Sequence, residues 1–115
     1  MADCIFCKIA QKEIPSNFVY EDESVVAFRD LEPQAPVHVL VIPKKHIESL
    51  LAAAPEDKAL IAHITCEVIP QLARELGIAD QGFRVVANTG DEGGQSVKHL
   101  HFHLLGGRSM QWPPG

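Results

Sequence analysis

The sequence lacks several features that mark other classes of protein. It contains no apolar run near the ~20 residues needed to cross a bilayer, and its first residues, Met1, Ala2 and Asp3, place no basic region ahead of an apolar one. We therefore expect neither a membrane span nor a secretory leader. Three cysteines are an odd number for a disulfide framework and suit a reducing compartment better, so we expect a cytoplasmic protein.

Charge of either sign is not concentrated anywhere in the chain. The 115 residues carry a formal charge of −5 at pH 7, spread without long acidic or basic runs. Non-specific attraction to nucleic acid or to anionic lipid is not favoured, and we expect neither as a partner. No internal repeat, linker or low-complexity segment divides the chain, and 46% hydrophobic residues are enough for one core. We expect a single domain over residues 1–115.

Three histidines alternate with apolar residues between His99 and Leu105, just ahead of two glycines. Alternation predicts a half-buried β-strand with the imidazoles on one face and the apolar side chains on the other. Side chains two apart lie about 7 Å apart along a strand, so His101 and His103 can both touch one phosphate-sized group. Histidine titrates near neutrality and serves as base, nucleophile or metal ligand, so we expect these imidazoles to face a cleft or a partner.

The rest of the chain predicts an α+β protein. Asp3 is expected to cap a short helix through about Gln11 that turns Ile5, Phe6 and Ile9 toward the body of the protein. A long amphipathic helix is expected from about Pro55 to Leu76, with Gly77 as its stop and a bend near Cys66 caused by Pro70. Turn signals and apolar patterns predict a helical turn over 44–51 and further strands at 17–21, 24–30, 37–42 and 83–88.

The loop 88–96 and the C-terminal tail are the remaining unusual segments. The loop has three glycines in nine residues, and glycine lets backbone N–H groups approach an anion closely. An ordinary hairpin could also use such a loop, but this one delivers Gly94, Gln95 and Ser96 to the start of the histidine strand. The tail from Trp112 to Gly115 is apolar and rigid, so we expect it to pack on something, such as a second subunit.

The alternating histidines resemble the signature of the histidine triad (HIT) superfamily. Segments 33–36, 41–46, 93–96 and 112–115 are similar, in order and spacing, to its histidine triad nucleotide-binding (Hint) branch. The resemblance covers nearly the whole chain. It implies a five-stranded antiparallel sheet with one long and one or two short helices, and a homodimer that joins two sheets into one of ten strands, with Trp112 near the partner subunit.

The resemblance also implies an activity, which is hydrolysis of the P–N bond of adenosine or guanosine 5′-phosphoramidates through transfer of the nucleotidyl group to a histidine. We expect His101, the central histidine, to be the nucleophile, with its second nitrogen held by a backbone carbonyl of the same strand or loop. His103 is expected to stabilise charge on the phosphoryl oxygens, and the Ser96 hydroxyl to hydrogen-bond the leaving amine. His38 could equally be a core histidine on its strand pattern; the resemblance implies an orienting partner. No cofactor is required for this catalysis.

A purine nucleoside monophosphate such as AMP, or its phosphoramidate, is the implied ligand. The Asp30 carboxylate could grip both ribose hydroxyls, although an ordinary turn aspartate looks the same in sequence. The resemblance places ribose and phosphate contacts, shared with His101 and His103, on Asp30, Leu31, Asn88, Gly94, Gln95 and Ser96. The implied base slot is apolar, formed by Ile5, Phe6, Ile9, Phe28 and Leu31, and such a slot would not sharply separate adenine from guanine.

Cys4 and Cys7 form a Cys-x-x-Cys pair that many Hint proteins lack. Other branches of the superfamily use such a pair with two histidines to bind structural zinc, and here the matching histidines are His46 and His99. A redox pair or two buried small residues would give the same pattern. Cys66 lies apart on the long helix, and we expect it to be buried.

Two other functions fit the same residues. In one, His99, His101 and His103 bind a catalytic metal that activates water, so chelators should abolish turnover. In the other, the protein is a nucleotide-binding interaction module with little turnover.

Overall fold

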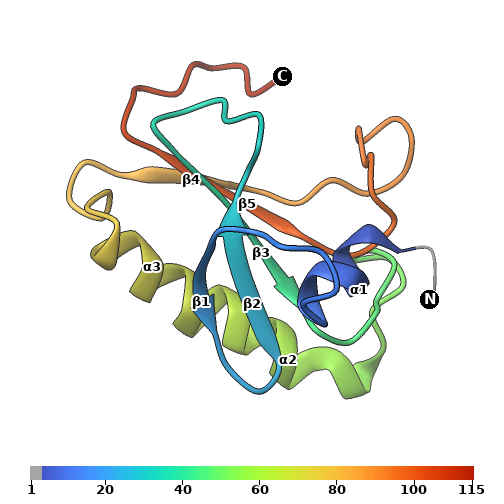
Figure 1. The fold of residues 1–115 in the computed structure, drawn as a ribbon. Coiled ribbons are helices and arrows are strands. Elements are labelled where there is room, and N and C mark those ends of the chain that lie inside the picture. Colours follow the sequence, from blue (N-terminus) through green and yellow to red (C-terminus); the bar gives the residue numbers. More distant parts are fainter. Residues whose placement is uncertain (1–3) are drawn as a thin grey trace.

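The computed structural model describes residues 4–115, and a five-stranded antiparallel sheet is its centre (Figure 1). The strands lie in the order β1-β2-β3-β5-β4. Their bounds are Phe18–Glu21 for β1, Val25–Arg29 for β2, Val37–Pro43 for β3, Phe83–Val86 for β4 and Phe102–Gly106 for β5. The predicted α+β class and the five-stranded antiparallel sheet are confirmed.

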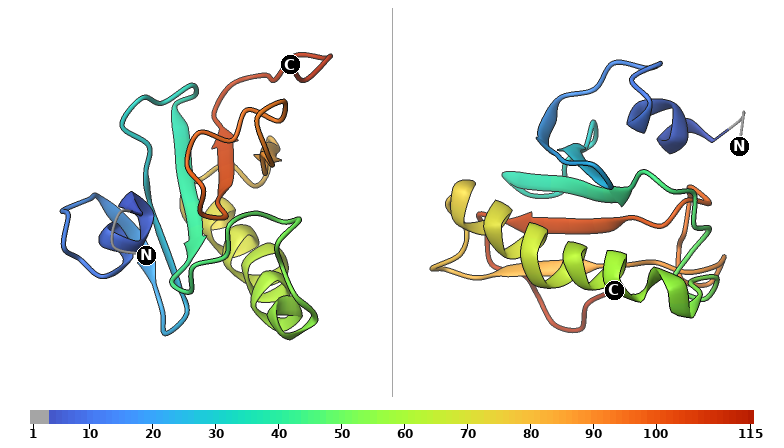
Figure 2. Two further views of the ribbon diagram at one scale, coloured as in Figure 1. Left: turned by 90° about the vertical axis from the view of Figure 1, so that its right-hand side faces the viewer. Right: turned by 90° about the horizontal axis from the view of Figure 1, so that it is seen from below.

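Helices cover both faces of this sheet. The short helix α1, Ile5–Ala10, lies on one face, and a continuous helical segment crosses the other, as the left panel of Figure 2 shows. That segment begins with a 3₁₀ turn at Pro55–Asp57 and continues as α2, Lys58–His63, a π-helical turn at Ile64–Val68 and α3, Ile69–Glu75. Among the described residues, no helix is both long and apolar enough to traverse a bilayer.

The π-helical turn lies where Pro70 was expected to bend the long helix. Proline has no N–H to donate, and in a regular α-helix its ring collides with the carbonyl four residues back, here that of Cys66. A π turn is wider than an α turn and absorbs the proline without ending the helix. Cys66 is exposed on this turn, so its predicted burial is wrong; Ile64 and Val68 are the residues that face the sheet.

Alternation along β3 and β5 divides the interior into two cores. Val39, Val41, Phe102 and Leu104 point to the long helix and belong to the larger core. On the other face, Leu40 and Ile42 join Val26 and Phe28 of β2 against Phe6 and Ile9 of α1. The predicted division of the histidine segment is therefore observed, because Leu100, Phe102 and Leu104 lie in the helix-side core and the histidines lie on the α1 side.

Several local expectations are wrong. Residues 44–51 form bends and a turn instead of a helical turn, and β4 ends at Val86 instead of Asn88. Strand β5 begins only at Phe102, because the Leu100 N–H donates to the Ile47 carbonyl and ties the preceding segment to the loop after β3. Ile5 is 47% exposed, at the rim of the small core instead of within it. Asp3 lies outside the described residues, and Cys4 is the N-cap residue of α1.

One hydrogen bond joins the C-terminal tail to β4. The Arg84 guanidinium donates to the Gln111 carbonyl at 2.9 Å, while Trp112 is 81% exposed. Within this chain the tail therefore leaves its tryptophan uncovered, and its packing against a second subunit stays a prediction.

Candidate active site

Two neighbouring strands bring three histidines together on the α1 side of the sheet. Leu40 of β3 pairs with His103 of β5 in the antiparallel register, so His38, two residues before Leu40, is a diagonal neighbour of His103. The His38 and His103 rings have centroids 5.1 Å apart, and the same distance separates the rings of His103 and His101. A row of imidazoles therefore runs along one face, from His38 to His101.

The His101 ring is held through one nitrogen only. Its Nδ1 donates to the carbonyl of His99 at 2.7 Å, which is the type of backbone partner that the sequence predicted. Because that bond places the proton on Nδ1, Nε2 carries the lone pair, and Nε2 has no hydrogen-bond partner among the described residues. Phe6 of α1 packs edge-on against the ring, with centroids 5.1 Å apart, and fixes its plane.

A fixed donor also determines where the protons lie on His38 and His103. The Gln34 backbone N–H donates to His38 Nδ1 at 3.0 Å, so His38 must carry its proton on Nε2. That Nε2–H donates to His103 Nδ1 at 2.9 Å. His103 in turn must carry its proton on Nε2. His101 therefore offers a lone pair at Nε2, and its neighbour His103 offers an N–H at Nε2.

Burial favours the neutral forms of His38 and His103. It lowers the pKa of His103 to about 4, with His101 and His38 adding to the effect. Burial also lowers the pKa of His38, although the Asp30 carboxylate, whose Oδ2 lies 3.4 Å from His38 Nε2, opposes the shift. Neutral imidazoles are what a nucleophile and a tautomer-specific donor require at neutral pH.

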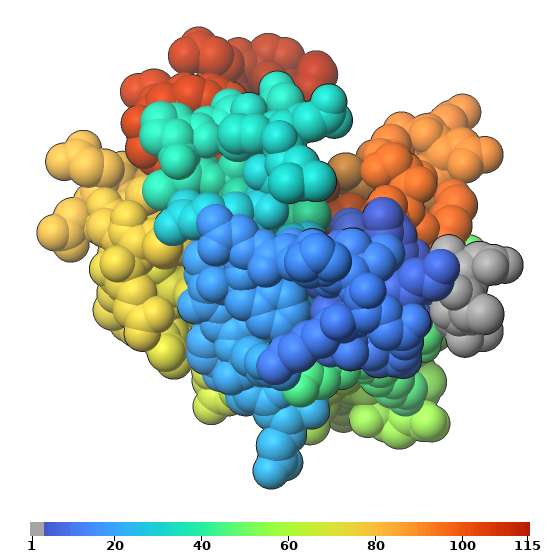
Figure 3. Space-filling view, in the orientation of Figure 1, coloured from blue at the N-terminus to red at the C-terminus, as the bar shows by residue number. Residues whose placement is uncertain are grey.

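The histidine row opens into a cleft of about 440 Å³. Helix α1 and the loop after it form one wall, the end of β2 with loop 30–36 forms the second, and residues Ser96 and Val97 form the third. In Figure 3 these three segments surround a recess on the face shown. The lining residues are Ile5, Phe6, Ile9, Ile14, Pro15, Ser16, Phe28, Arg29, Asp30, Leu31, Glu32, Leu40, Ser96, Val97, His101 and His103.

Most of the residues that the sequence proposed for nucleotide contact line this cleft. They are Ile5, Phe6, Ile9, Phe28, Asp30, Leu31, Ser96, His101 and His103. Asn88, Gly94 and Gln95 are not among the lining residues. The Gln95 side chain is buried, accepts from the Gly90 N–H and donates to the carbonyls of Glu48 and Val97, so it braces the Gly-rich loop from behind.

The sequence did not point to several lining residues. Leu40 could have been found, because it is two residues from His38 and alternation places both on one face. Ile14, Pro15 and Ser16 lie in an irregular loop where no periodicity indicates which side chain faces inward. These three residues reach the cleft because the loop folds back across the end of α1, where the N–H groups of Glu13 and Ile14 both donate to the Lys8 carbonyl.

A second cluster lies behind the histidine row. The side chains of Cys4, Cys7, His46 and His99 bring four potential ligand atoms within 4.8 Å of one another. Cys4 Sγ is 3.3 Å from His99 Nδ1, and Cys7 Sγ is 3.3 Å from His46 Nδ1. Zinc bonds of ~2.3 Å to sulfur and ~2.1 Å to nitrogen in a tetrahedron would place sulfur and nitrogen about 3.6 Å apart. The cluster therefore fits a tetrahedral zinc ion with little movement.

The surroundings of His99 support this fit. Its Nε2–H donates to the Pro43 carbonyl at 2.8 Å, which leaves the Nδ1 lone pair facing the two sulfurs. A ligating histidine usually has its second nitrogen held in this way. Burial, together with the neighbouring Cys4, raises the pKa of the Cys7 thiol to about 11. A dication would reverse that preference, because coordination favours the thiolate.

The three alternating histidines do not converge on one metal. His99 belongs to the cysteine cluster, whereas His103 lies with Asp30 and His38 in a second group of potential ligands. That second group fits a metal poorly, because the Gln34 N–H occupies His38 Nδ1 and the His38 proton then lies on Nε2, the atom that would have to ligate.

Known proteins resemble this chain in sequence and in fold. The family model of the HIT domain matches residues 11–110 of the chain. An uncharacterised HIT-like protein of Synechocystis is 56% identical, with 98% of this chain and 97% of the relative covered. A HIT family hydrolase of Legionella pneumophila superposes with a TM-score of 0.96 at 50% identity, covering 98% of this chain and all of that one. A histidine triad protein of Clostridium difficile gives 0.93 at 51% identity over 96% of both chains.

Proposed function

Because the chain belongs to the HIT family, we propose that it is a hydrolase that cleaves the P–N bond of purine nucleoside 5′-phosphoramidates through a nucleotidyl-histidine intermediate. One observation carries the proposal. His101 is held by Nδ1 alone, and its ring lines the cleft beside His103, whose proton is fixed on Nε2. Attack on phosphorus requires a nucleophilic lone pair and a donor that stabilises charge on the phosphoryl oxygens, and these two adjacent rings offer both on one face.

The proposed reaction has two steps. In the first, His101 Nε2 attacks phosphorus, the bond from phosphorus to the amine nitrogen breaks, and the amine leaves with a proton supplied by the histidine row or the substrate. The His99 carbonyl accepts from the Nδ1–H and stabilises the charge that the ring gains. In the second, water attacks phosphorus and gives a proton to the group that protonated the amine, the bond to His101 breaks, and the nucleoside monophosphate is released. The His103 Nε2–H donates to a phosphoryl oxygen in both steps, and the exposed Ser96 hydroxyl can hydrogen-bond the amine.

Apolar walls and a carboxylate make the cleft suitable for a nucleoside. Phe6 and Phe28 meet edge to face with centroids 5.6 Å apart and form the inner end with Leu40. Asp30 lines the same cleft with Oδ2 3.4 Å from His38 Nε2, and its Oδ1 accepts from the Glu32 N–H, which orients the carboxylate for a ribose. The slot supplies apolar area for a purine and few polar groups that would read its edge.

Mass spectrometry of enzyme quenched during turnover of adenosine phosphoramidate tests this function. The expected result is a mass increase of one adenylyl group on the peptide that contains His101, absent from His101→Ala. Turnover without an adduct, abolished by chelators, would instead support a catalytic metal. A wild type that binds AMP but hydrolyses no faster than His101→Ala would make the protein a binding module.

We further propose that Cys4, Cys7, His46 and His99 hold a structural zinc ion. Bound there, zinc would join α1 to the loop after β3 and to the segment before β5, which are the elements that position Phe6 and His101. The metal would supply stability and no chemical step. Thiol ligands of this kind persist in a reducing compartment, which supports a cytoplasmic location.

A homodimer is the remaining proposal. Strand β4 is an edge of the sheet, and two of its apolar side chains, Phe83 and Val85, are 40% and 41% exposed. An exposed apolar edge strand is a ready surface for pairing with a second copy, as the implied ten-stranded sheet requires. Sedimentation velocity tests this state directly, and a monomer at micromolar concentration would contradict it.

A further inference from the structure

The tautomer of His38, on which the proton arrangement of the site depends, is set by a surface loop. Loop 30–36 has no regular secondary structure, and Gln34 is exposed on it. Yet the Gln34 N–H is the group that holds His38 Nδ1 as an acceptor. Internal bonds give the loop its shape, since the Glu32 N–H donates to Asp30 Oδ1 and Gln34 Nε2 donates to the Glu32 carbonyl. The Asp30 N–H donates to the His38 carbonyl at 3.0 Å and ties the start of the loop to β3, but none of these bonds holds Gln34 to another part of the fold.

The segment after β5 attaches this loop to the rest of the fold. Arg108 Nε donates to the Gln34 carbonyl at 2.9 Å, and Arg108 Nη1 donates to the Ser109 carbonyl at 3.0 Å. Beside it, Gly107 has a φ of +91°, and a Cβ on it would lie 2.9 Å from Pro36 Cβ. The chain therefore approaches the loop closely at Pro36 and binds it at Gln34.

We infer that Arg108 is a positioning residue for the histidine row. By holding the Gln34 carbonyl, it keeps the neighbouring N–H on His38 Nδ1, so that the His38 proton stays on Nε2 and the His103 proton stays on its own Nε2. Arg108 touches no reacting atom and acts through Gln34 alone. The inference rests on the proposed function, because it assigns Arg108 to the same reaction.

The physical reason is that the two tautomers of a free imidazole differ little in energy, so its hydrogen-bond partners decide between them. The Asp30 carboxylate, 3.4 Å from His38 Nε2, also favours a proton on that nitrogen, but the Gln34 N–H is the group that occupies Nδ1. If the Gln34 N–H moves away, His38 can place its proton on Nδ1. Two lone pairs would then face each other between His38 Nε2 and His103 Nδ1, which favours transfer of the His103 proton to its own Nδ1. His103 would then have no Nε2–H to donate to the phosphoryl group.

Arg108→Ala tests the inference, with Arg84→Ala as the matched control. Each arginine donates to a backbone carbonyl 2.9 Å away in a distant loop or tail, but only Arg108 reaches Gln34. The second bond of Arg108, to the Ser109 carbonyl, joins adjacent residues only. We expect Arg108→Ala to lower kcat on adenosine phosphoramidate about fivefold, the factor associated with one net hydrogen bond, with KM changed less than about twofold. Arg84→Ala should leave both constants unchanged.

Nitrogen-15 correlation spectra of the imidazole rings near neutral pH provide a second readout that needs no turnover. His38 should show an acceptor Nδ1 and a protonated Nε2 in the wild type and in Arg84→Ala, and a mixture of tautomers in Arg108→Ala. Unchanged His38 spectra in Arg108→Ala, an unchanged kcat, or equal losses in both variants would overturn the inference. If the wild type does not hydrolyse phosphoramidates, the proposed function fails, and the spectra alone still show whether Arg108 fixes the tautomer.

Discussion

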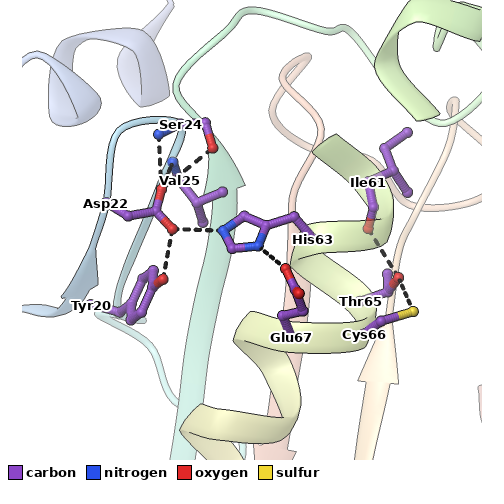
Figure 4. Close-up of polar contacts among 9 residues, drawn as sticks. All are labelled: Tyr20, Asp22, Ser24, Val25, Ile61, His63, Thr65, Cys66 and Glu67. Atoms are coloured by element: carbon purple, nitrogen blue, oxygen red, sulfur yellow. Dashed lines mark hydrogen bonds and ion pairs between the residues drawn. The ribbon is translucent and has the colours of Figure 1, made fainter. Parts of the chain in front are cut away.

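Two histidine environments in this small protein differ in the sign of their pKa shift. In the buried row, His38 and His103 contact a backbone N–H and each other, and burial lowers the pKa of both. At the opposite surface, His63 of α2 lies between two carboxylates, and its pKa is raised by hydrogen bonds to Asp22 and then Glu67 (Figure 4). The same side chain is thus held toward its neutral form in one place and toward its cationic form in the other.

The surface cluster joins the β1–β2 turn to the long helix. His63 Nε2 donates to Asp22 Oδ2 at 2.7 Å, and the same carboxylate accepts from the Tyr20 hydroxyl and the N–H groups of Ser24 and Val25 (Figure 4). Burial would raise the pKa of Asp22, but these hydrogen bonds hold it well below its usual range. The hydrogen bond to Asp22 raises the pKa of Tyr20 to about 12. The balance between burial and nearby carboxylates therefore decides the direction of each shift. Hydrogen bonds to two carboxylates raise the pKa of His63, whereas burial outweighs the Asp30 carboxylate and lowers the pKa of His38.

Replacing one histidine from each environment gives the largest expected contrast. His101→Ala removes the proposed nucleophile and should lower kcat for adenosine phosphoramidate by on the order of 10³-fold or more. His63→Ala removes an imidazole outside the cleft and should leave kcat within about twofold, because it disturbs no group that touches substrate. Steady-state kinetics on both variants decides the matter. Comparable losses in the two would mean that the histidine row is not the chemical centre.

The cysteine cluster is a third environment, in which the histidine partner is a thiol. Cys7→Ser should remove bound zinc and lower the free energy of unfolding by about 3 kcal/mol or more, because a closed site joins three segments that are distant in sequence. Cys66→Ser, at the exposed cysteine of the π turn, is the control and should change neither property. Zinc content by atomic emission and denaturant unfolding measure both effects. A wild type that takes up no zinc would contradict the assignment.

The sequence could predict what depends on periodicity. Alternation placed Leu104 and His103 on opposite faces, and the segment from Pro55 to Glu75 is helical as expected. The cluster of Cys4 with His99 was expected only because of a family resemblance. No local rule relates a Cys-x-x-Cys pair to a histidine 92 residues away, as Cys7 and His99 are.

The surface cluster shows what the sequence could not predict. Asp22 falls between the strands expected at 17–21 and 24–30, and nothing in its spacing relates it to His63, 41 residues later. Their contact depends on how the hairpin lies across the helix, which is set by packing of the whole core. The bond from the Gln34 N–H to His38 could not be predicted for a related reason, because almost every residue type carries a backbone N–H and the sequence does not indicate which one a loop will use.

An acid titration of the protein should protonate the histidines of the two environments at different pH values. As pH falls, His63 should protonate at a pH above 6.5, whereas His103, with a pKa lowered by burial to about 4, should stay neutral until far lower pH. Ring carbon and proton shifts of the assigned histidines report each event. Protonation of His103 together with or ahead of His63 would show that the buried row is open to water and would remove the distinction.

The smallest expected effect concerns stability and its pH dependence. The folded pKa of His63 lies above the unfolded value of about 6.5. The stability that the protonated imidazole gives the folded state is therefore complete below pH ~6.5 and is lost as pH rises through the folded pKa. His63→Gln should therefore lower the free energy of unfolding by about 1 kcal/mol in mild acid and by less in alkaline solution. Denaturant unfolding at several pH values measures the difference.

The control for this variant is Gln71→Ala, which removes a hydrogen bond from Gln71 Nε2 to Glu75 on the same helix, where no proton is exchanged. Its cost should not vary between mild acid and alkaline solution. A pH-independent loss in His63→Gln would mean that the imidazole packs between Asp22 and Glu67 as a neutral ring. Charge would then no longer distinguish His63 from the buried histidine row, and the two environments would differ only in how deeply the imidazoles are buried.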